Sequence, residues 1–159
     1  MTAVRVCFVD TYAVRRTGAE GGGALEVLAL RRGSNGRCPE SWETVHGTIE
    51  PGETPVEASL RELREETGLA PERLYNLSRT EAFYQHRTDE LALIPVFVAF
   101  VAPHAMAKLS PEHDRAEWLT PAAAAQRFAW PRERRALDDI LSIVGGGDAG
   151  LLEDVLRVC

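Results

Sequence analysis

Three glutamates that lie close together in the chain, Glu62, Glu65 and Glu66, have the type and spacing needed to hold a divalent cation. In a helix, residues at i, i+3 and i+4 lie on neighbouring turns, so the three carboxylates would share one face. Such like charges repel one another by roughly 0.2–0.5 kcal/mol per exposed pair, and Arg61 and Arg64 would only soften the repulsion. A solvated acidic face is the ordinary explanation of this pattern. However, oxygen ligands suit Mg²⁺, with Mn²⁺ as a substitute, and a bound cation would remove the repulsion.

The segment around these glutamates carries the signals of a helix start and a helix end. Thr54-Pro55-Val56-Glu57 is a capping box with proline at the first helical position. Gly68 suits the left-handed residue that often follows a helix. Together these signals predict a helix over residues 55–67. The apolar side chains that we expect its buried stripe to contain are Val56, Leu60 and Leu63.

The loop before this helix contains residues that turn the chain. Gly47, Pro51 and Gly52 bend it toward the start of the helix. Because Gly47 has no side chain, the backbone can approach the glutamates closely at this position. Its carbonyl oxygen could therefore join the metal shell.

The loop and helix together, GTIEPGETPVEASLRELREETGL, match the pattern G-x5-E-x7-R-E-U-x-E-E-x-G-U, in which U is aliphatic. This stretch resembles the Nudix box. The residues that fill its defined positions are Gly47, Glu53, Arg61, Glu62, Leu63, Glu65, Glu66, Gly68 and Leu69. A chance match in a chain of this length is on the order of 10⁻⁸ from average residue usage. The order of strands and helices around the box also resembles a whole Nudix domain, an α/β/α sandwich.

The resemblance implies a role for each polar residue of the box. The metal ligands would be Glu62, Glu65, Glu66 and the Gly47 carbonyl. Arg61 would orient a glutamate through a salt bridge, and Glu53 would support the loop. The reaction would be attack of water on a phosphorus of a nucleoside-diphosphate-linked substrate, in which a carboxylate accepts the proton of the water. Which carboxylate does so remains open between Glu62, Glu65 and Glu112.

A second acidic segment, SPEHDRAEWL, lies downstream and contains Glu112 and His113. By position alone Glu112 is as well explained as a surface loop acid. Glu-His followed by Trp-Leu also resembles a segment of several Nudix subfamilies, in which the glutamate supplies a further metal ligand or the base. We therefore expect Glu112 at the metal site and His113 near the substrate.

The residues outside the box bear on the substrate. Many Nudix proteins have Pro-Gly-Gly at the entrance to the box, whereas this chain has Val45-His46-Gly47. That pattern and the later WLTPAAAA resemble the subgroup that acts on dihydroneopterin triphosphate and dATP. The candidate substrate-binding residues are Arg31, Trp42, His46, Tyr84 and His113. Each has a structural alternative: a solvated strand end for the arginine, a core position for the tryptophan, and a structural role for the histidines.

Three functions remain in competition. The first is metal-dependent hydrolysis of a nucleoside or pterin triphosphate to a monophosphate and pyrophosphate. The second is hydrolysis of a dinucleoside polyphosphate, since such enzymes also carry the Glu-His and Trp-Leu segment. The third is a nucleotide-binding Nudix module without catalysis, which loss of a box glutamate would indicate. All three metal carboxylates are present, which favours an enzyme.

Composition excludes several other classes. The chain has 159 residues and a formal net charge of −6, which fits one domain, 1–159, with no general attraction to nucleic acid. We therefore expect a small phosphorylated molecule as the partner. The three cysteines are widely spaced, and no export signal or membrane-spanning run is visible. We expect a cytoplasmic protein that does not bind membranes and could form a homodimer.

The elements that must position these residues follow from apolar patterning and breakers. Strands are expected over 3–9, 24–31, 74–86, 91–101 and 115–119, with a short extended segment over 40–46. The stretch after the first strand, up to Gly23, is expected to be a flexible connection, and Pro95 indicates an edge or a bulge. Besides the box helix, helices are expected over 121–128, 131–144 and 148–158. The fold class is α+β, with a mixed sheet flanked by helices.

Overall fold

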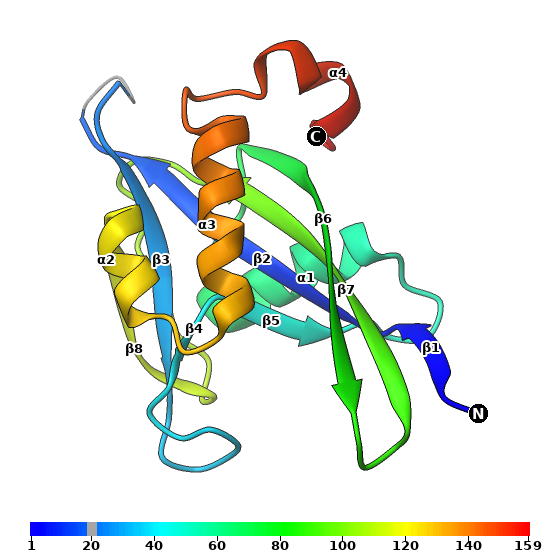
Figure 1. The fold of residues 1–159 in the computed structure, drawn as a ribbon. Helices are drawn as coiled ribbons and strands as arrows, with labels where there is room; N and C mark the ends of the chain where they lie inside the picture. The colour runs from blue at the N-terminus through cyan, green and yellow to red at the C-terminus, as the bar shows by residue number, and fades with distance from the viewer. Residues whose placement is uncertain (19–21) are drawn as a thin grey trace.

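The computed structural model describes residues 1–18 and 22–159 as a mixed sheet with helices on both faces (Figure 1). The strands are β1 (Ala3–Val6), β2 (Phe8–Arg16), β3 (Leu25–Arg32), β4 (Trp42–Glu43), β5 (Val45–Thr48), β6 (Arg73–Gln85), β7 (Glu90–Phe100) and β8 (His113–Leu119). The helices are α1 (Pro55–Thr67), α2 (Pro121–Arg127), α3 (Pro131–Val144) and α4 (Glu153–Leu156), and a 3₁₀ turn spans Gly150–Leu152.

Two hydrophobic cores lie on opposite faces of the sheet. Alternate side chains of β2 enter each core, because successive residues of a strand point to opposite faces. Val9 and Ala13 pack in the core covered by α1, whereas Tyr12 and Val14 pack in the core covered by α2 and α3. In Figure 1, α3 lies in front of the sheet and α1 behind it. The predicted α/β/α sandwich is confirmed.

Helix α1 begins and ends where its capping signals predict. The hydroxyl of Thr54 accepts a hydrogen bond from the Glu57 amide at 3.3 Å, and the Thr54 amide donates to the Glu57 carboxylate at 2.8 Å. Gly68 adopts the left-handed conformation, with φ of 69°. These bonds satisfy backbone groups at the helix ends that have no partner within the helix. The box helix is therefore held by its own local sequence.

The buried face of α1 differs from the predicted stripe. Leu63 is fully buried as expected, but Val56 and Leu60 are only partly buried. Ala58 and Ser59 take the innermost positions, and the Ser59 hydroxyl lies 2.7 Å from that of Thr11 on β2. Small side chains let the helix approach the sheet closely. The helix is therefore turned so that the small residues, rather than the larger ones, face the strand.

The prediction for the N-terminal region was wrong. The chain forms β1 over Ala3–Val6 and then a second strand, β2, that continues to Arg16 instead of a flexible connection. Asp10 and Thr11 make the strand look polar, yet both are fully buried because other elements provide hydrogen-bond partners for them. Of the predicted glycine-rich connection, Gly21 lies outside the described residues.

Pro95 lies in the middle of the sheet. It belongs to β7, which pairs with β6 on one side and with β1 and β2 on the other. The pairing of β6 with β7 shifts register between Asn76 and Thr80, and Thr80 is the partner of Pro95. An irregularity is present opposite Pro95, but its extra residues lie in β6 rather than in the strand of Pro95, as the prediction had it, and the alternative of an edge strand is wrong. The irregular register accommodates a residue that cannot donate to the ladder.

The remaining elements agree with the sequence apart from their ends. Strand β8 begins at His113, two residues before the predicted start, because His113 still pairs with Arg32 after a register shift. Helices α2 and α3 begin at Pro121 and Pro131 as predicted. The last helix, expected over 148–158, is shorter: a 3₁₀ turn precedes α4, which ends at Leu156.

Strand β2 divides its pairing between two groups of strands. Over Phe8–Thr11 it pairs with β5, and over Val14–Arg16 it pairs with β3. Strand β3 in turn carries β4 and β8. The sheet therefore divides along β2 into two arms. One arm contains β5, and the other contains β3, β4 and β8.

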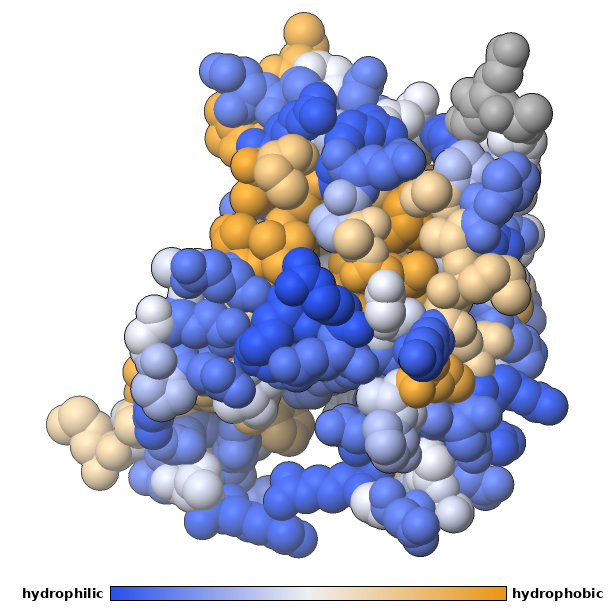
Figure 2. Space-filling view, turned by 180° about the vertical axis from the view of Figure 1, so that it is seen from behind, coloured by the Kyte–Doolittle hydropathy of each residue, from blue (hydrophilic) through white to orange (hydrophobic). Residues whose placement is uncertain are grey.

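The surface seen from behind the view of Figure 1 is mostly hydrophilic, with apolar side chains gathered in a band across its upper half (Figure 2). Among the described residues no helix is both long and apolar enough to cross a membrane.

Candidate active site

Glu62 and Gly47 meet where α1 crosses β5. A Cβ atom placed on Gly47 would lie 2.0 Å from the carboxylate carbon of Glu62, far closer than two such atoms can approach. Only glycine therefore allows this carboxylate to lie against the strand. Burial raises the pKa of Glu62, and the charges of Glu65 and Glu112 add to the rise, although Arg61 opposes it.

Arg61 holds the acidic side chains of the box together. Its Nε and one terminal nitrogen donate to the Glu53 carboxylate at 2.8 and 2.9 Å. The other terminal nitrogen donates to Glu62 at 2.8 Å and to Glu65 at 3.2 Å. A further bond, of 2.8 Å, reaches the carbonyl oxygen of Thr48. One guanidinium thus connects loop, strand and helix, and it orients two of the candidate metal ligands.

Glu66 is the most unusual carboxylate of the box. Its pKa is raised to about 9, mainly by burial and in addition by the nearby charges of Glu62, Glu43 and Glu112, although Arg32 opposes the rise. Its Oε2 atom is buried without a hydrogen-bond partner. A buried carboxylate without a partner is costly unless a cation neutralises it.

This donor set fits a hard divalent cation, since the charge of Glu112 lies close enough to raise the pKa of both Glu62 and Glu66, and that of Glu62 raises the pKa of Glu66. Glu65 adds a largely exposed carboxylate. Within residues 1–18 and 22–159, no three acidic, histidine or cysteine side chains already converge at ligand distance. Arg61 explains part of this, because it binds both Glu62 and Glu65.

The loop before β8 brings the second acidic segment to the end of α1. The Ser110 amide donates to the Glu66 carbonyl oxygen at 3.2 Å, and the Gly33 amide donates to the Glu112 carbonyl oxygen at 2.9 Å. Glu112 is exposed, with its charge near Glu62 and Glu66. The structure therefore places Glu112 beside the box carboxylates.

His113 lies behind the box carboxylates. Its side chain is fully buried, with Nε2 3.1 Å from Oε1 of Glu43 and Nδ1 4.0 Å from Oε2 of Glu66. Arg32 donates to the same Glu43 oxygen at 2.8 Å. Burial alone would raise the pKa of Glu43, but these two partners lower it below its ordinary value. His113 thus connects two carboxylates and does not line the cavity described next.

A cavity of ≈ 370 Å³ lies between the two arms of the sheet. Phe8 and His46 line it from the arm with β5, and Arg32 and Glu43 line it from the other arm. His46 is the neighbour of Gly47, and Glu43 contacts His113, which faces Glu66. The cavity is therefore lined by the residue that precedes the box, His46, and by Glu43, the partner of His113, but by none of the box carboxylates themselves.

The wall formed by β6, β7 and the start of α3 is apolar and aromatic. It contains Phe83, Ile94 and Trp130. The rings of Phe83 and Trp130 meet edge to face with centroids 6.2 Å apart, and the ring of Phe8 stacks on His46 at 5.2 Å. Aromatic side chains of this kind suit a flat ring.

The polar wall is built on a buried aspartate. Asp10 accepts hydrogen bonds from Nδ1 of His46 at 2.7 Å and from Nε of Arg132 at 2.8 Å. Burial by itself would raise the pKa of Asp10, but these two partners outweigh it and the pKa lies below its ordinary value. The carboxylate is therefore ionised and accepts only, which assigns the Nδ1 hydrogen to His46. Arg37 adds a further positive charge to the cavity.

Of the predicted substrate-binding residues, only His46 lines this cavity. Arg31 makes a bidentate pair with Asp114 at 2.7 and 2.8 Å, and Tyr84 is exposed and donates to Asp89. Trp42 is partly buried against the core, with Arg127 4.6 Å above its ring. These three therefore lie outside the cavity.

Sequence reasoning missed several residues that do line the cavity. One of them, Phe83, is the immediate neighbour of Tyr84. Because successive strand residues point to opposite faces, an error of one position selects the wrong face. Trp130 and Arg132, at the start of α3, carried no local signal of a site. Only the partner of Arg132, the buried Asp10 in a distant strand, indicates its position.

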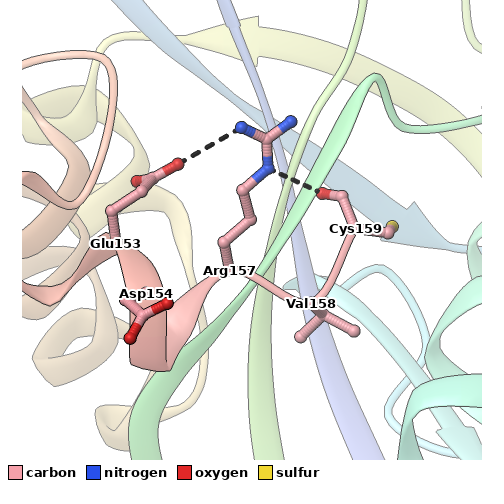
Figure 3. Close-up of a pocket in the computed structure, with 5 residues that line it drawn as sticks. All are labelled: Glu153, Asp154, Arg157, Val158 and Cys159. Carbon is pink, nitrogen blue, oxygen red and sulfur yellow. Dashed lines mark hydrogen bonds and ion pairs between the residues drawn. The ribbon is translucent and has the colours of Figure 1, made fainter.

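A second hollow, of ≈ 410 Å³, lies at the C-terminal end of the chain (Figure 3). Its residues are the last of the chain, and Arg157 there donates to Glu153 and to the Cys159 carbonyl oxygen, each at 3.3 Å. It contains no aromatic ring and none of the box glutamates. Although this hollow is slightly larger, the cavity between the arms is the better candidate, because aromatic rings line it together with His46, the residue before Gly47 of the box.

Comparison with known proteins agrees with this geometry. Residues 9–140 match the family model described as the NUDIX domain. The match covers more than half of the chain, and the chain therefore belongs to the Nudix family.

Two curated relatives match only in part. An octanoyltransferase from Myxococcus xanthus is 34% identical over 122 residues, which make up 76% of this chain and 32% of that protein. An RNA pyrophosphohydrolase from Xanthomonas campestris pv. campestris is 43% identical over 54 residues, 34% of this chain and 26% of that protein. The chain thus spans about a third of the first relative and about a quarter of the second.

Solved structures share the fold over nearly the whole chain. A C. elegans Ap4A hydrolase has a TM-score of 0.71 at 20% identity, covering 87% of this chain and 97% of that one. The E. coli dihydroneopterin triphosphate pyrophosphohydrolase has a TM-score of 0.65 at 23% identity, covering 89% and 99%. At such identities the likeness concerns the fold alone.

Proposed function

We propose that this protein hydrolyses a phosphoanhydride bond of a nucleoside or pterin triphosphate, releasing a monophosphate and pyrophosphate. One observation supports the proposal: a cavity with aromatic and arginine side chains is lined by His46, the residue directly before Gly47 of a complete Nudix box. A flat ring would lie among the aromatic side chains, and the phosphates would extend toward the box.

Mg²⁺, with Mn²⁺ as a substitute, would be held by Glu62, Glu65, Glu66, the carbonyl oxygen of Gly47 and Glu112. When bound, such a cation neutralises the charge of the phosphates and orients water and leaving group. The buried Glu66, with an Oε2 atom that has no hydrogen-bond partner, supports this assignment most directly.

The side chains of the protein supply positioning and proton transfer. Arg61 orients Glu62 and Glu65 through its two hydrogen bonds. The general base is one of Glu62, Glu65 and Glu112, because a carboxylate beside the reacting phosphorus can accept the proton of the attacking water. Arg32 and Arg37, at the polar side of the cavity, are placed to bind phosphate oxygens.

Two alternatives keep some support. The fold is shared with an Ap4A hydrolase, so a dinucleoside polyphosphate is the second candidate substrate. An RNA pyrophosphohydrolase matches part of the chain, but the formal net charge of −6 disfavours a nucleic-acid ligand. A binding module without catalysis is disfavoured because every box glutamate is present.

The test is a substrate panel with Mg²⁺ and, separately, Mn²⁺. It should include nucleoside triphosphates, dihydroneopterin triphosphate, Ap4A, ADP-ribose and a triphosphorylated RNA. Products would be identified by chromatography, and phosphate would be measured after addition of pyrophosphatase. We expect pyrophosphate and a monophosphate from one of the triphosphates. Absence of turnover of every compound with either cation would refute the enzymatic function.

Variants locate the reaction at the box. We expect Glu65→Gln and Glu66→Gln each to lower kcat by several orders of magnitude with an unchanged circular dichroism spectrum. Glu72→Gln, at an exposed glutamate outside the box, is the matched control and should be as active as the wild type. Wild-type activity in both box variants would place the metal site elsewhere.

A further inference from the structure

A buried ion pair forms part of the wall of the cavity, away from the box. Asp10 is fully buried and accepts two hydrogen bonds from Arg132, at 2.8 Å from Nε and 3.4 Å from Nη2. It also accepts the Nδ1 hydrogen of His46. Since a buried carboxylate is costly without partners, these contacts hold the guanidinium in one orientation.

The hydrogen bonds between Arg132 and Asp10 determine which N–H donors of Arg132 are left to bind a ligand. A guanidinium has N–H donors along two usable edges and no acceptor. The edge formed by Nε and Nη2 faces Asp10, and among the described residues Arg132 has no other hydrogen-bond partner. The edge formed by Nη1 and Nη2 therefore remains available at the cavity, which Arg132 lines.

The same guanidinium is fixed on a second side by an aromatic ring. Its central carbon lies 4.9 Å from the centre of the Trp130 ring, and Trp130 meets Phe83 edge to face. A planar ligand among these aromatic rings would present its edge to Arg132. Because the guanidinium is already oriented, little side-chain entropy is lost when it forms hydrogen bonds with that edge.

We propose that Arg132 is a specificity-determining residue that recognises a carbonyl oxygen and the adjacent ring nitrogen on the heterocycle of the substrate. The inference rests on the function proposed above. Two parallel donors match O6 and N7 of a 6-oxopurine. They equally match O4 and N5 of a 4-oxopterin. Adenine places an amino group, itself a donor, where the oxygen is required, and pyrimidines have no acceptor nitrogen at the position that N7 takes relative to O6.

The expected preference is substantial. A bidentate contact between arginine and such a ring edge discriminates on the order of 10- to 100-fold against the wrong ring. An adenine ring would also leave an N–H of Arg132 facing the adenine amino group, and unpaired buried donors oppose binding. Asp10 acts as a positioning residue, because it touches Arg132 and not the substrate.

The test compares kcat/KM for GTP, ITP, ATP and 7-deaza-GTP with Mg²⁺. ITP keeps both acceptors but lacks the 2-amino group, and 7-deaza-GTP lacks only the ring nitrogen. We expect GTP and ITP to be equivalent, and ATP and 7-deaza-GTP to be at least about tenfold poorer. Dihydroneopterin triphosphate is assayed in parallel, because a pterin presents the same pair of acceptors as guanine. Its kcat/KM relative to that of GTP shows which of the two rings the protein prefers. Equal efficiency with ATP and GTP would overturn the proposal.

Variants test the residue itself. Arg132→Lys keeps the charge but replaces two parallel donors by a point charge. It should reduce the ratio of GTP to ATP efficiency toward one, with a larger loss on GTP than on ATP. Asp10→Asn should reduce the ratio in the same direction, mainly through a higher KM for GTP. The control is Arg15→Lys, at the far end of β2, where Arg15 pairs with Glu26 at 2.8 Å. A folded Arg132→Lys protein with the wild-type ratio would contradict the assignment.

Binding measurements separate failure of this inference from failure of the proposed function. Calorimetry with GTP and ATP, on Glu65→Gln protein with Mg²⁺, does not depend on turnover. If wild-type protein hydrolyses nothing but the variant binds GTP more tightly than ATP, the function is wrong and the assignment of Arg132 holds. Equal binding of both nucleotides overturns the assignment whether or not hydrolysis occurs.

Discussion

Among single residues, Gly47 has the sharpest geometric requirement. A methyl group at this position would meet the carboxylate of Glu62 at 2.0 Å, so Gly47→Ala must displace that carboxylate. Because misplacement of a catalytic group by about 1 Å can cost on the order of 10²-fold, we expect kcat to fall by about that factor. Steady-state kinetics with Mg²⁺ would measure the loss.

Gly146→Ala is the matched control for that substitution. No atom lies within 4 Å of a Cβ placed there, so this variant should keep both fold and rate. If Gly47→Ala were as active as Gly146→Ala, Glu62 would not need its position against β5.

Glu66 lets metal binding be measured without catalysis. Burial raises the pKa of its carboxyl group to about 9, so the folded protein without a cation gains nothing from an ionised side chain there. Glu66→Gln should therefore unfold at the same or a higher temperature than the wild type in EDTA. With Mg²⁺ at a hundredfold excess over Kd, the wild type should gain about 2.7 kcal/mol.

The variant should gain much less under the same conditions. Differential scanning calorimetry with EDTA and with Mg²⁺ would show both effects. An equal gain in the two proteins would show that Glu66 does not bind the cation.

The box residues could be predicted from the sequence because each is defined by its neighbours within one turn and one loop. The cavity residues could not. His46 was found through its place beside Gly47, whereas Phe83 was missed by one position along a strand. The face of a strand is decided by its partners, and those partners are distant in sequence.

At the level of elements, α3 carries a second buried acid. Glu133 is fully buried, and its Oε2 accepts a hydrogen bond from the Thr44 amide at 2.6 Å. Burial raises its pKa well above the ordinary value, and the charge of Asp10 adds to the rise. Glu133 therefore keeps its proton to a higher pH than an ordinary glutamate does, and it secures the start of α3 to the segment between β4 and β5.

A pH dependence of stability follows from Glu133. Above the ordinary pKa of glutamate the unfolded chain loses this proton while the folded protein keeps it. The contribution is therefore complete at low pH and declines as the pH rises toward the folded pKa. Glu133→Gln should reduce the fall in unfolding free energy that accompanies a rise of pH above the ordinary pKa of glutamate. Urea unfolding at several pH values would measure it, with Glu72→Gln as the control, and identical slopes in wild type and Glu133→Gln would contradict the prediction.

Elements with local signals were predicted well, and elements with distant partners were not. Helix α1 matches its predicted bounds because its capping box and Gly68 act within the helix itself. Strand β2 was cut short in the prediction because Asp10 and Thr11 look like residues of a loop. Their partners are a histidine, an arginine and a serine from other elements, so no local pattern could show that they are buried.

For the whole molecule, some segments are expected to contribute to the unfolding free energy without affecting the candidate active site. The C-terminal segment packs against β6 at the end away from the box, and Leu156 there is buried in the core under α3. Leu156→Ala should lower the unfolding free energy by about 2–3 kcal/mol, in the lower part of the usual range because a short segment can relax. Its kcat and KM at a temperature well below unfolding should equal those of the wild type.

The control for Leu156→Ala is Leu151→Ala, because Leu151 is fully exposed in the same segment. Thermal unfolding and kinetics on the two variants would test this expectation. A changed KM in Leu156→Ala would show that the C-terminal segment affects the cavity.

The division of the sheet into two arms could not be inferred from the individual strand patterns. It depends on which part of β2 pairs with β5 and which part pairs with β3. The expected mixed sheet was correct, yet the cavity exists only because β5 and β3 leave β2 at different points. Pairing of this kind is non-local, and strand patterns do not reveal it.

The alternation of β5 has a consequence for the engineering of new activities. His46 and Gly47 are adjacent, but one side chain position faces Asp10 and the other faces Glu62. The position that would contact the ring of the proposed substrate and the position against which Glu62 lies are therefore on opposite faces of the same strand. A library of variants at His46, Phe83 and Trp130 could be screened for hydrolysis of substrates with other heterocycles. The box carboxylates would remain in place, so that the substrate preference could be changed without altering the proposed metal site.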